Sequence, residues 1–255
     1  MICGSVNGII RYCRKRSMKK ESAKWFGFLI LCILTSVANA ESAKLEDGVS
    51  AVEKQDYTKA YQVFRELSEQ GNAEAQYNLA ILYRQGKGVK QDKKLALEWF
   101  EKSAAQGLAS AEYYLGNLYD TGDTVTRDPA IAVQWYKKAA EKGNPMAQSN
   151  LGVAYANGEG VGQDIVKAYV WFSLAASQGL TAALENRNIL KKEMSDELQK
   201  NAQRLTTEYF NRYVTPYVQH TKNIPSGGIP GAAQAHEKMN NEPLKLPVPA
   251  NKNHP

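Results

Sequence analysis

The sequence predicts an all-α fold, an α/α solenoid in which similar helix pairs stack along the chain. The first observation behind this prediction is a period of 36 residues, which places the same residue types in register. The second is the helical spacing of apolar residues within each period. A fixed period of roughly 20 to 50 residues is typical of repeat arrays, since each unit buries its apolar face against its neighbours. The clearest columns are Gly71, Gly107, Gly143 and Gly179; Ala75, Ala111, Ala147 and Ala183; Leu79, Leu115 and Leu151; Tyr83, Tyr119 and Tyr155.

The first helix of each unit is predicted from an apolar stripe. In one unit, Ala75, Leu79 and Leu82 follow the spacing that a helix buries on one face. Gly86 then follows, and glycine takes the left-handed conformation at a helix C-terminus without a Cβ penalty. We therefore expect this helix to end at Gly86, and its counterparts to end at Gly122 and Gly158.

The second helix of each unit is predicted from its N-cap. An aspartate recurs in register before it, at Asp56, Asp92, Asp128 and Asp164. A carboxylate there accepts hydrogen bonds from free backbone N–H groups and meets the positive end of the helix dipole. Pro129, directly after Asp128, fits the first helical position. Trp99, Trp135 and Trp171 recur in register beside Phe100, Tyr136 and Phe172, so we interpret them as core residues and not as an aromatic ligand box.

These residues resemble the Sel1-like repeat, a relative of the tetratricopeptide repeat. Residues 147–161 and 167–179 follow the family pattern almost letter for letter. The resemblance implies a right-handed superhelix of helix pairs. This sequence departs from the pattern at Ala80, where other units have Gly116 and Gly152, and at Thr124, where they have Gly88 and Gly160. We interpret both departures as local adjustments of packing and loop.

The predicted organisation has five parts. Three full repeats are predicted at 72–107, 108–143 and 144–179, preceded by a degenerate helix pair at 41–71. Capping helices are predicted at 180–215, with Ser195 as the N-cap of the last one and Leu198, Ala202, Leu205, Tyr209 and Phe210 on its apolar side. Residues 1–40 are a predicted signal peptide, and residues 216–255 a predicted disordered tail because they are rich in Pro, Gly, Asn and Lys.

Residues 1–40 are typical of an export signal. Seven Lys or Arg residues precede an apolar run at 25–37, which is followed by a small-x-small signal-peptidase pattern ending at Ala40. The run is about 13 residues, whereas a bilayer span needs roughly 18 or more, so cleavage is favoured over a permanent membrane anchor. Met18 begins an ordinary signal-peptide start, so residues 1–17 are interpreted as an over-extended start.

Charge and cysteine content exclude several function classes. The net charge is +6, but residues 1–40 hold seven of the 32 basic and one of the 26 acidic residues, which leaves 25 of each. A neutral mature chain lacks the basic footprint of a nucleic-acid-binding protein. All three cysteines lie in the same segment, so the mature chain is expected to have no disulfide. The penicillin-binding and weak β-lactamase activities of cysteine-paired Sel1-like relatives are therefore not expected.

No motif of a catalytic or metal centre occurs in the predicted repeats. His220, His236 and His254 all lie in the predicted tail, which leaves the repeats without an imidazole for acid–base chemistry or metal ligation. Asp120 and Asp123 form a carboxylate pair, which we interpret as solvated. We expect no enzyme activity, no metal and no cofactor.

Positions that vary between units are the candidates for partner recognition. By resemblance to tetratricopeptide-like arrays, the first helix of each unit lines the concave face, and residues just before and two after its leucine point toward a ligand. The candidate partner-binding residues are Tyr77, Asn78, Tyr113, Tyr114, Asn117, Ser149 and Asn150, and Ile81 and Val153 share the column of Asn117. Tyrosine rings and carboxamides suit an extended peptide backbone. The alternative, that such residues pack between units, stays open.

The sequence favours an exported, monomeric repeat scaffold that binds a protein or peptide partner through its concave face. The expected location is the periplasm or the extracellular space, with no stable membrane insertion after cleavage. The alternatives are an envelope enzyme, a binder of peptidoglycan fragments, or a secreted factor acting on a host cell. The fold alone does not separate them.

Overall fold

The structure is a computed structural model that describes residues 40–216 of the 255-residue chain. The predicted signal segment before Ala40, the three cysteines, the three histidines and the predicted tail after Pro216 lie outside the described residues. Of the described residues, those from Leu45 onward belong to one compact unit.

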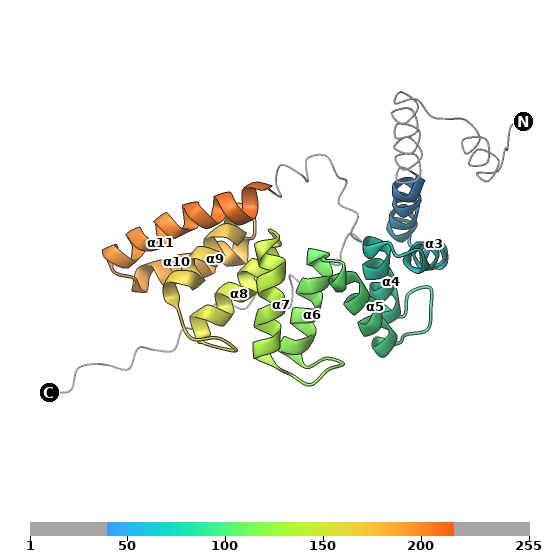
Figure 1. The fold of residues 1–255 in the computed structure, drawn as a ribbon, viewed down its shortest axis with the longest axis horizontal. Helices are drawn as coiled ribbons and strands as arrows, with labels where there is room; N and C mark the ends of the chain where they lie inside the picture. Colours follow the sequence, from blue (N-terminus) through green and yellow to red (C-terminus); the bar gives the residue numbers. More distant parts are fainter. Residues whose placement is uncertain (1–39, 217–255) are drawn as a thin grey trace, which may run out of the picture. The chain divides into compact units, whose positions relative to one another are not determined.

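The described residues form helices joined by short turns, without a strand among them (Figure 1). Residues 40–53 are helical. The helices that follow are α3 (Tyr57–Glu69), α4 (Ala73–Gln85), α5 (Lys93–Ala105), α6 (Ala109–Thr121), α7 (Pro129–Glu141), α8 (Pro145–Asn157), α9 (Ile165–Ser177), α10 (Thr181–Glu193), α11 (Asp196–Tyr209) and the π-helix η1 (Phe210–Val214). The prediction of an all-α array of helix pairs is confirmed.

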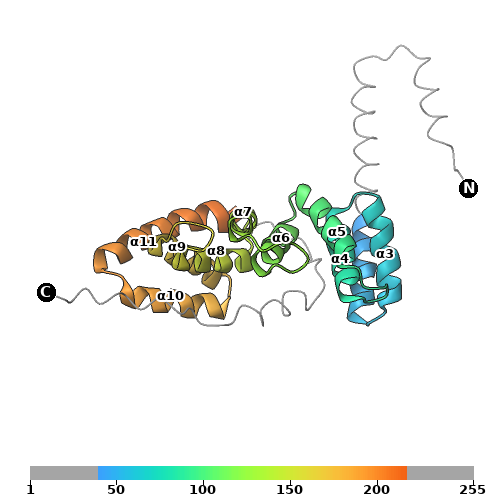
Figure 2. The same ribbon diagram turned by 90° about the horizontal axis from the view of Figure 1, so that it is seen from below.

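Each helix from α3 to α9 packs against the next one in chain order, and Figure 2 shows the same succession from a second side. The pairs α4 with α5, α6 with α7, and α8 with α9 make the closest contacts, while α11 folds back onto α9. One apolar cluster joins Ile81 of α4, Phe100 of α5 and Leu115 of α6. Similar clusters precede and follow it, so each unit completes its core with residues of its neighbour.

The predicted helix ends are confirmed. The side chains of Asp56, Asp92, Asp128 and Asp164 each accept a backbone N–H in the first turn of the following helix. Gly86, Gly122 and Gly158 end α4, α6 and α8 with φ angles of 68°, 75° and 73°. These positive angles explain why the column is glycine.

Both departures from the repeat pattern have structural consequences. A Cβ added to Gly116 would lie 2.6 Å from Cδ1 of Tyr136, and one added to Gly152 would lie 2.8 Å from Cδ1 of Phe172. Glycine therefore admits the ring of the following helix, a role that Ala80 does not share. Thr124 has a φ of 79°, which is uncommon for a β-branched residue.

The capping helix α11 buries a partly different set of residues from the set predicted. Ser195 caps α11 as expected, but Leu198 and Phe210 are 43% and 37% exposed and do not belong to the apolar face. The helix widens to the π-helical η1 at Phe210, which shifts the buried face along the chain. Ala202 is buried and Tyr209 contacts Trp171 edge-on at 5.4 Å, as predicted, and Tyr213 also stacks on Trp171 at a ring distance of 5.7 Å.

The tryptophan column is only partly core. Trp171 is 4% exposed beneath the cap, as predicted. Trp99 and Trp135 are half-buried at the margin of the apolar cluster, and Lys102 and Lys138 each cover one indole ring at 4.0 Å. These two rings have both a packing face and a cation–π contact.

Candidate functional site

The candidate partner-binding residues lie in the interior of the stack. Their exposed fractions are 8% for Tyr77, 0% for Asn78, 5% for Tyr113, 0% for Tyr114, 4% for Asn117, 7% for Ser149 and 8% for Asn150. Asn78 and Tyr114 are fully buried in this conformation. A binding role for the seven residues stays a prediction.

Tyrosine rings fill the space between the first two complete units. The ring of Tyr114 stacks on Phe100 with centroids 3.9 Å apart, and Tyr77 contacts Phe100 edge-on at 5.7 Å. The guanidinium of Arg84 lies over the outer face of Tyr114 at 5.1 Å. Tyr113 lies beside the second helix of its own unit, with its ring 6.0 Å from that of Tyr136 in α7.

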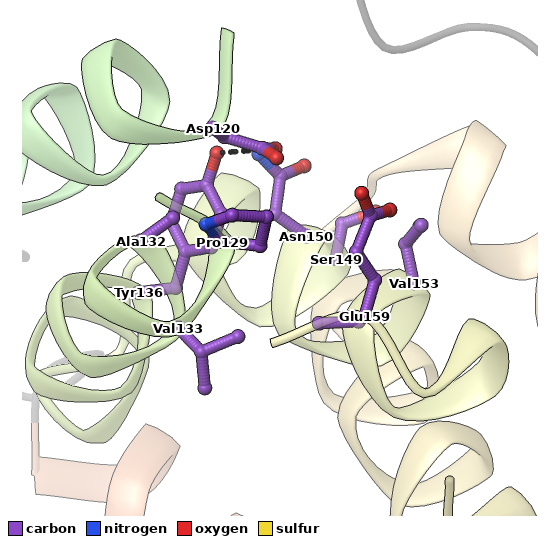
Figure 3. Close-up of a pocket in the computed structure, with 10 residues that line it drawn as sticks. Asp120, Pro129, Ala132, Val133, Tyr136, Ser149, Asn150, Val153 and Glu159 are labelled. Atoms are coloured by element: carbon purple, nitrogen blue, oxygen red, sulfur yellow. Dashed lines mark hydrogen bonds between the residues drawn. The ribbon is translucent and has the colours of Figure 1, made fainter. Parts of the chain in front are cut away.

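The following unit has smaller side chains at the same positions. Ser149 and Asn150 occupy the columns of Tyr113 and Tyr114, and a pocket of about 200 Å³ lies there between α7 and α8 (Figure 3). The pocket is lined by Asp120, Pro129, Ala132, Val133, Tyr136, Ser149, Asn150, Val153, Ala154 and Glu159. The sequence analysis predicted three of these residues as variable positions: Ser149, Asn150 and Val153.

One side of the pocket carries a hydrogen-bonded carboxylate. Tyr136 donates its hydroxyl to Oδ2 of Asp120 at 3.1 Å, as the dashed line in Figure 3 shows. Partial burial raises the pKa of Asp120, the bond from Tyr136 offsets part of that rise, and the negative charge of Glu159 adds to it. Burial also raises the pKa of Tyr136 well above its ordinary value. Asp120 is therefore a carboxylate with incomplete charge compensation.

The rim holds a second carboxylate and one cation. Arg127 pairs with Glu159 through its guanidinium, and its Nε donates to the backbone oxygen of Asp120 at 2.7 Å. The distance from its Nη2 to Oδ1 of Asp120 is 3.9 Å. The Arg127 side chain is 51% exposed, so its compensation of the carboxylates is screened by water.

The interior of the pocket combines apolar walls with polar atoms. Val133 and Val153 contribute apolar surface, while Ser149 and Asn150 contribute a hydroxyl and a carboxamide. Ser149 is 7% exposed, and its hydroxyl makes no hydrogen bond within the described part of the chain. The Ser149 oxygen is not a buried atom without a partner, so it is reached from the pocket and can exchange water for a hydrogen bond to a ligand.

Sequence reasoning missed the carboxylates of this site. Asp120 was interpreted as a solvated surface residue, whereas it is partly buried beside Tyr136. The signal was available in the columns, since Asp120 occupies the position of Arg84 in the unit before it. The next unit has Ala156 at this position, so the column varies from unit to unit as the predicted recognition positions do.

Two further features of the described residues bear on the site. Among residues 40–216, no group of His, Cys, Asp and Glu side chains is arranged to hold a metal ion. No described helix combines the length and the apolar character that a bilayer crossing requires.

A family model for the Sel1 repeat matches four consecutive segments, residues 40–72, 73–108, 109–144 and 145–180, which together cover more than half of the chain. This chain belongs to the Sel1 repeat family. The first matched segment includes the degenerate pair predicted at 41–71, and the others coincide with the predicted repeats to within one residue. Sel1 repeat proteins are generally non-catalytic scaffolds that mediate protein–protein interaction.

Solved structures of two Sel1-type proteins resemble the chain. A Sel1 repeat protein from Oxalobacter formigenes is 29% identical with a TM-score of 0.54, and the match covers 56% of this chain and 59% of that one. A protective antigen of uropathogenic Escherichia coli strains with an SLR fold is 30% identical with a TM-score of 0.49, over 66% of this chain and 44% of the antigen. The chain thus spans about half the length of these proteins. No curated protein matches the sequence.

Proposed function

We propose that this Sel1 repeat protein is an exported, monomeric scaffold that binds an extended segment of a protein or peptide partner in the cell envelope or outside the cell. The pocket between α7 and α8 is the anchor point of that interaction. The observation that carries the proposal is the polar-lined pocket beside Ser149 and Asn150, which stand where the preceding unit has Tyr113 and Tyr114. The first unit has Tyr77 and Asn78 at these positions.

The size of the pocket favours a single side chain as its occupant. Pockets that enclose small-molecule ligands usually measure roughly 300–1,000 Å³. A pocket of about 200 Å³ is smaller, yet it exceeds the roughly 150 Å³ in which a cavity holds one benzene ring. The carboxamide of Asn150 and the hydroxyl of Ser149 supply hydrogen-bonding groups for the neighbouring peptide.

Photocrosslinking tests the proposed site. A photoreactive phenylalanine at Ala130, an exposed residue next to Pro129 of the pocket wall, should capture the partner from an envelope extract. The matched control is the same probe at Lys94, which occupies the exposed equivalent position one unit earlier. Capture from Ala130 should disappear in the double variant Ser149→Tyr with Asn150→Tyr, which copies the side chains of the preceding unit.

Folding of the filled variant is checked by thermal melting. Its melting temperature should stay near that of the wild type, since the preceding unit accommodates tyrosines at both positions. Val153→Phe fills the pocket from another position and serves as a second variant. Equal crosslinking in wild type and in a folded, filled variant would contradict the proposed site.

Export is supported by the signal-like features of residues 1–40 and by the neutral charge of the remainder. Mature protein isolated from the envelope should begin at Glu41 and remain in solution without detergent. Recovery of a chain that still carries residues 25–37 would refute the export proposal.

A further inference from the structure

We propose that the pocket takes a lysine or arginine side chain of the bound peptide, with the cationic head between Asp120 and Glu159 and the methylene stem against Val133 and Val153. This inference rests on the proposed function and specifies the chemistry of its anchor. It follows from three features: the charges of the pocket, its free hydroxyl, and the ion pairs of the preceding unit.

The charges of the lining favour a cation. Asp120 and Glu159 lie on different sides of the pocket, with Asn150 and Ser149 between them (Figure 3). The lining itself contains no basic residue among its ten described members. Arg127, at the rim, satisfies Glu159 but stays 3.9 Å from Asp120. The same Nη2 thus serves both carboxylates, so two acids share one internal cation and the ionised pocket keeps an excess of negative charge that a second cation can balance.

The interior suits the remainder of a long basic side chain. Lysine and arginine bury their methylene stems against apolar surface while their charged heads reach polar groups. Val133 and Val153 supply that apolar surface. The hydroxyl of Ser149, which lacks a partner within residues 40–216, can accept an N–H from the bound cation.

The preceding unit makes the corresponding ion pairs within the chain. There Asp123 accepts bonds from Lys93 at 2.8 Å and from Arg84 at 3.2 Å. The equivalent of Asp123 in the pocket is Glu159, but the equivalents of the two cations are Pro129 and Asp120.

The carboxylate of Asp123 thus has a counterpart in Glu159. The two basic partners have none, because Pro129 stands in place of Lys93 and Asp120 in place of Arg84. Arg127, at the position that Gln91 holds one unit earlier, supplies Glu159 with one cation where Asp123 has two, and a cation from another chain supplies the second.

A titration followed by NMR tests the inference. The probes are Nα-acetyl-lysine N-methylamide and its arginine counterpart, added to ¹⁵N-labelled protein. We expect saturable shifts at the backbone amides of Ser149, Val153 and Glu159. The uncharged norleucine and citrulline derivatives should bind at least about tenfold more weakly, because they retain the stem or the hydrogen bonds without the charge.

Charge variants assign the effect to the two carboxylates. Asp120→Asn with Glu159→Gln should weaken lysine and arginine binding at least about tenfold. Arg127→Ala, which removes the competing internal cation, should strengthen it several-fold. The control is Glu98→Gln with Glu101→Gln, the same charge change at exposed positions of α5, which should leave binding unchanged. Equal binding of the uncharged derivatives, no saturable binding, or an unaffected carboxylate variant would overturn the inference.

The crosslinking assay separates this inference from the proposed function. If the filled pocket abolishes partner capture while Asp120→Asn with Glu159→Gln leaves it intact, the scaffold proposal stands and the cationic anchor is wrong. If both variants abolish capture, both proposals are supported. If neither does, both are refuted.

Discussion

Replacing Glu112 and Lys142 together by glutamine should change the free energy of unfolding by less than about 1 kcal/mol, whereas Lys142→Met alone should cost about 3 kcal/mol. Lys142 lies 2.6 Å from Oε1 of Glu112, whose side chain is 4% exposed. Its Nζ also donates to the backbone oxygen of Gly107 at 2.8 Å. Removing the lysine leaves a buried carboxylate without its counterion.

The magnitudes follow from the neighbouring units. Removing one partner of a buried ion pair lowers the free energy of unfolding by about 3–5 kcal/mol. The lower end of this range applies because the Lys142 side chain is 32% exposed and water can partly replace it. The same columns in the units before and after hold glutamine pairs joined at 2.8 Å, Gln76 with Gln106 and Gln148 with Gln178. The fold therefore accommodates a hydrogen-bonded pair of glutamines at the positions of Glu112 and Lys142.

The glutamine pair also satisfies one more group. Gln76 and Gln148 accept the bond of the pair through Oε1 and each donate an N–H to a backbone oxygen of the preceding helix, at 3.2 Å and 3.1 Å. Oε2 of Glu112 is buried and makes no hydrogen bond within the described part of the chain. An introduced amide at position 112 provides the donor that the carboxylate lacks.

A double-mutant cycle measures the effect by thermal and urea denaturation of wild type, Glu112→Gln, Lys142→Met, Lys142→Gln and the double glutamine variant. A loss of about 3 kcal/mol corresponds to a fall in melting temperature of roughly 6–12 °C for a domain of this size. A double glutamine variant that melts as low as Lys142→Met, or a Lys142→Met variant that melts like the wild type, would refute the reasoning.

Three further predictions concern loop strain, helix packing and pH. Thr124→Gly should raise stability by about 1 kcal/mol in urea denaturation, because it removes a β-branched side chain from a positive φ. Gly116→Ala should lower stability by about 1–3 kcal/mol in the same assay, because the added Cβ meets Tyr136 at 2.6 Å. The raised pKa of Asp120 means that the folded state binds this proton more tightly, so its contribution to stability should decline as pH rises from about 4 through the folded pKa. Asp120→Asn should remove that decline from a series of melts at different pH; an unchanged pH profile would contradict it.

The fold was predictable because its determinants are local and repeated. The caps at Asp92 and Asp128 and the left-handed glycine at Gly122 act through backbone groups within one turn, so residue type and spacing were sufficient. The prediction for the capping helix α11 was partly wrong because its final turn does not keep the α-helical period. A period of 3.6 residues placed Phe210 on the buried face, but the π-helical turn at the same residue brings Tyr213 there instead.

The site was less predictable because it depends on volumes and on charge pairs between units. Tyr114 and Asn150 occupy the same column, and only packing distinguishes a ring stacked on Phe100 from a carboxamide beside a pocket. The depth of Asp120 likewise depends on Tyr136 of the next helix. Comparing columns could identify the variable positions, but not which of them border open space.

The central claim is that the pocket between α7 and α8 anchors a partner. It is tested most directly by the dissociation constant of a synthetic peptide with the sequence of the partner segment that crosslinking identifies. It should be measured for wild type and for Ser149→Tyr with Asn150→Tyr, in variants with matched melting temperatures. An anchor residue is worth about 2 kcal/mol or more, so filling the pocket should weaken binding roughly 30-fold. Equal dissociation constants for the two proteins would contradict the account.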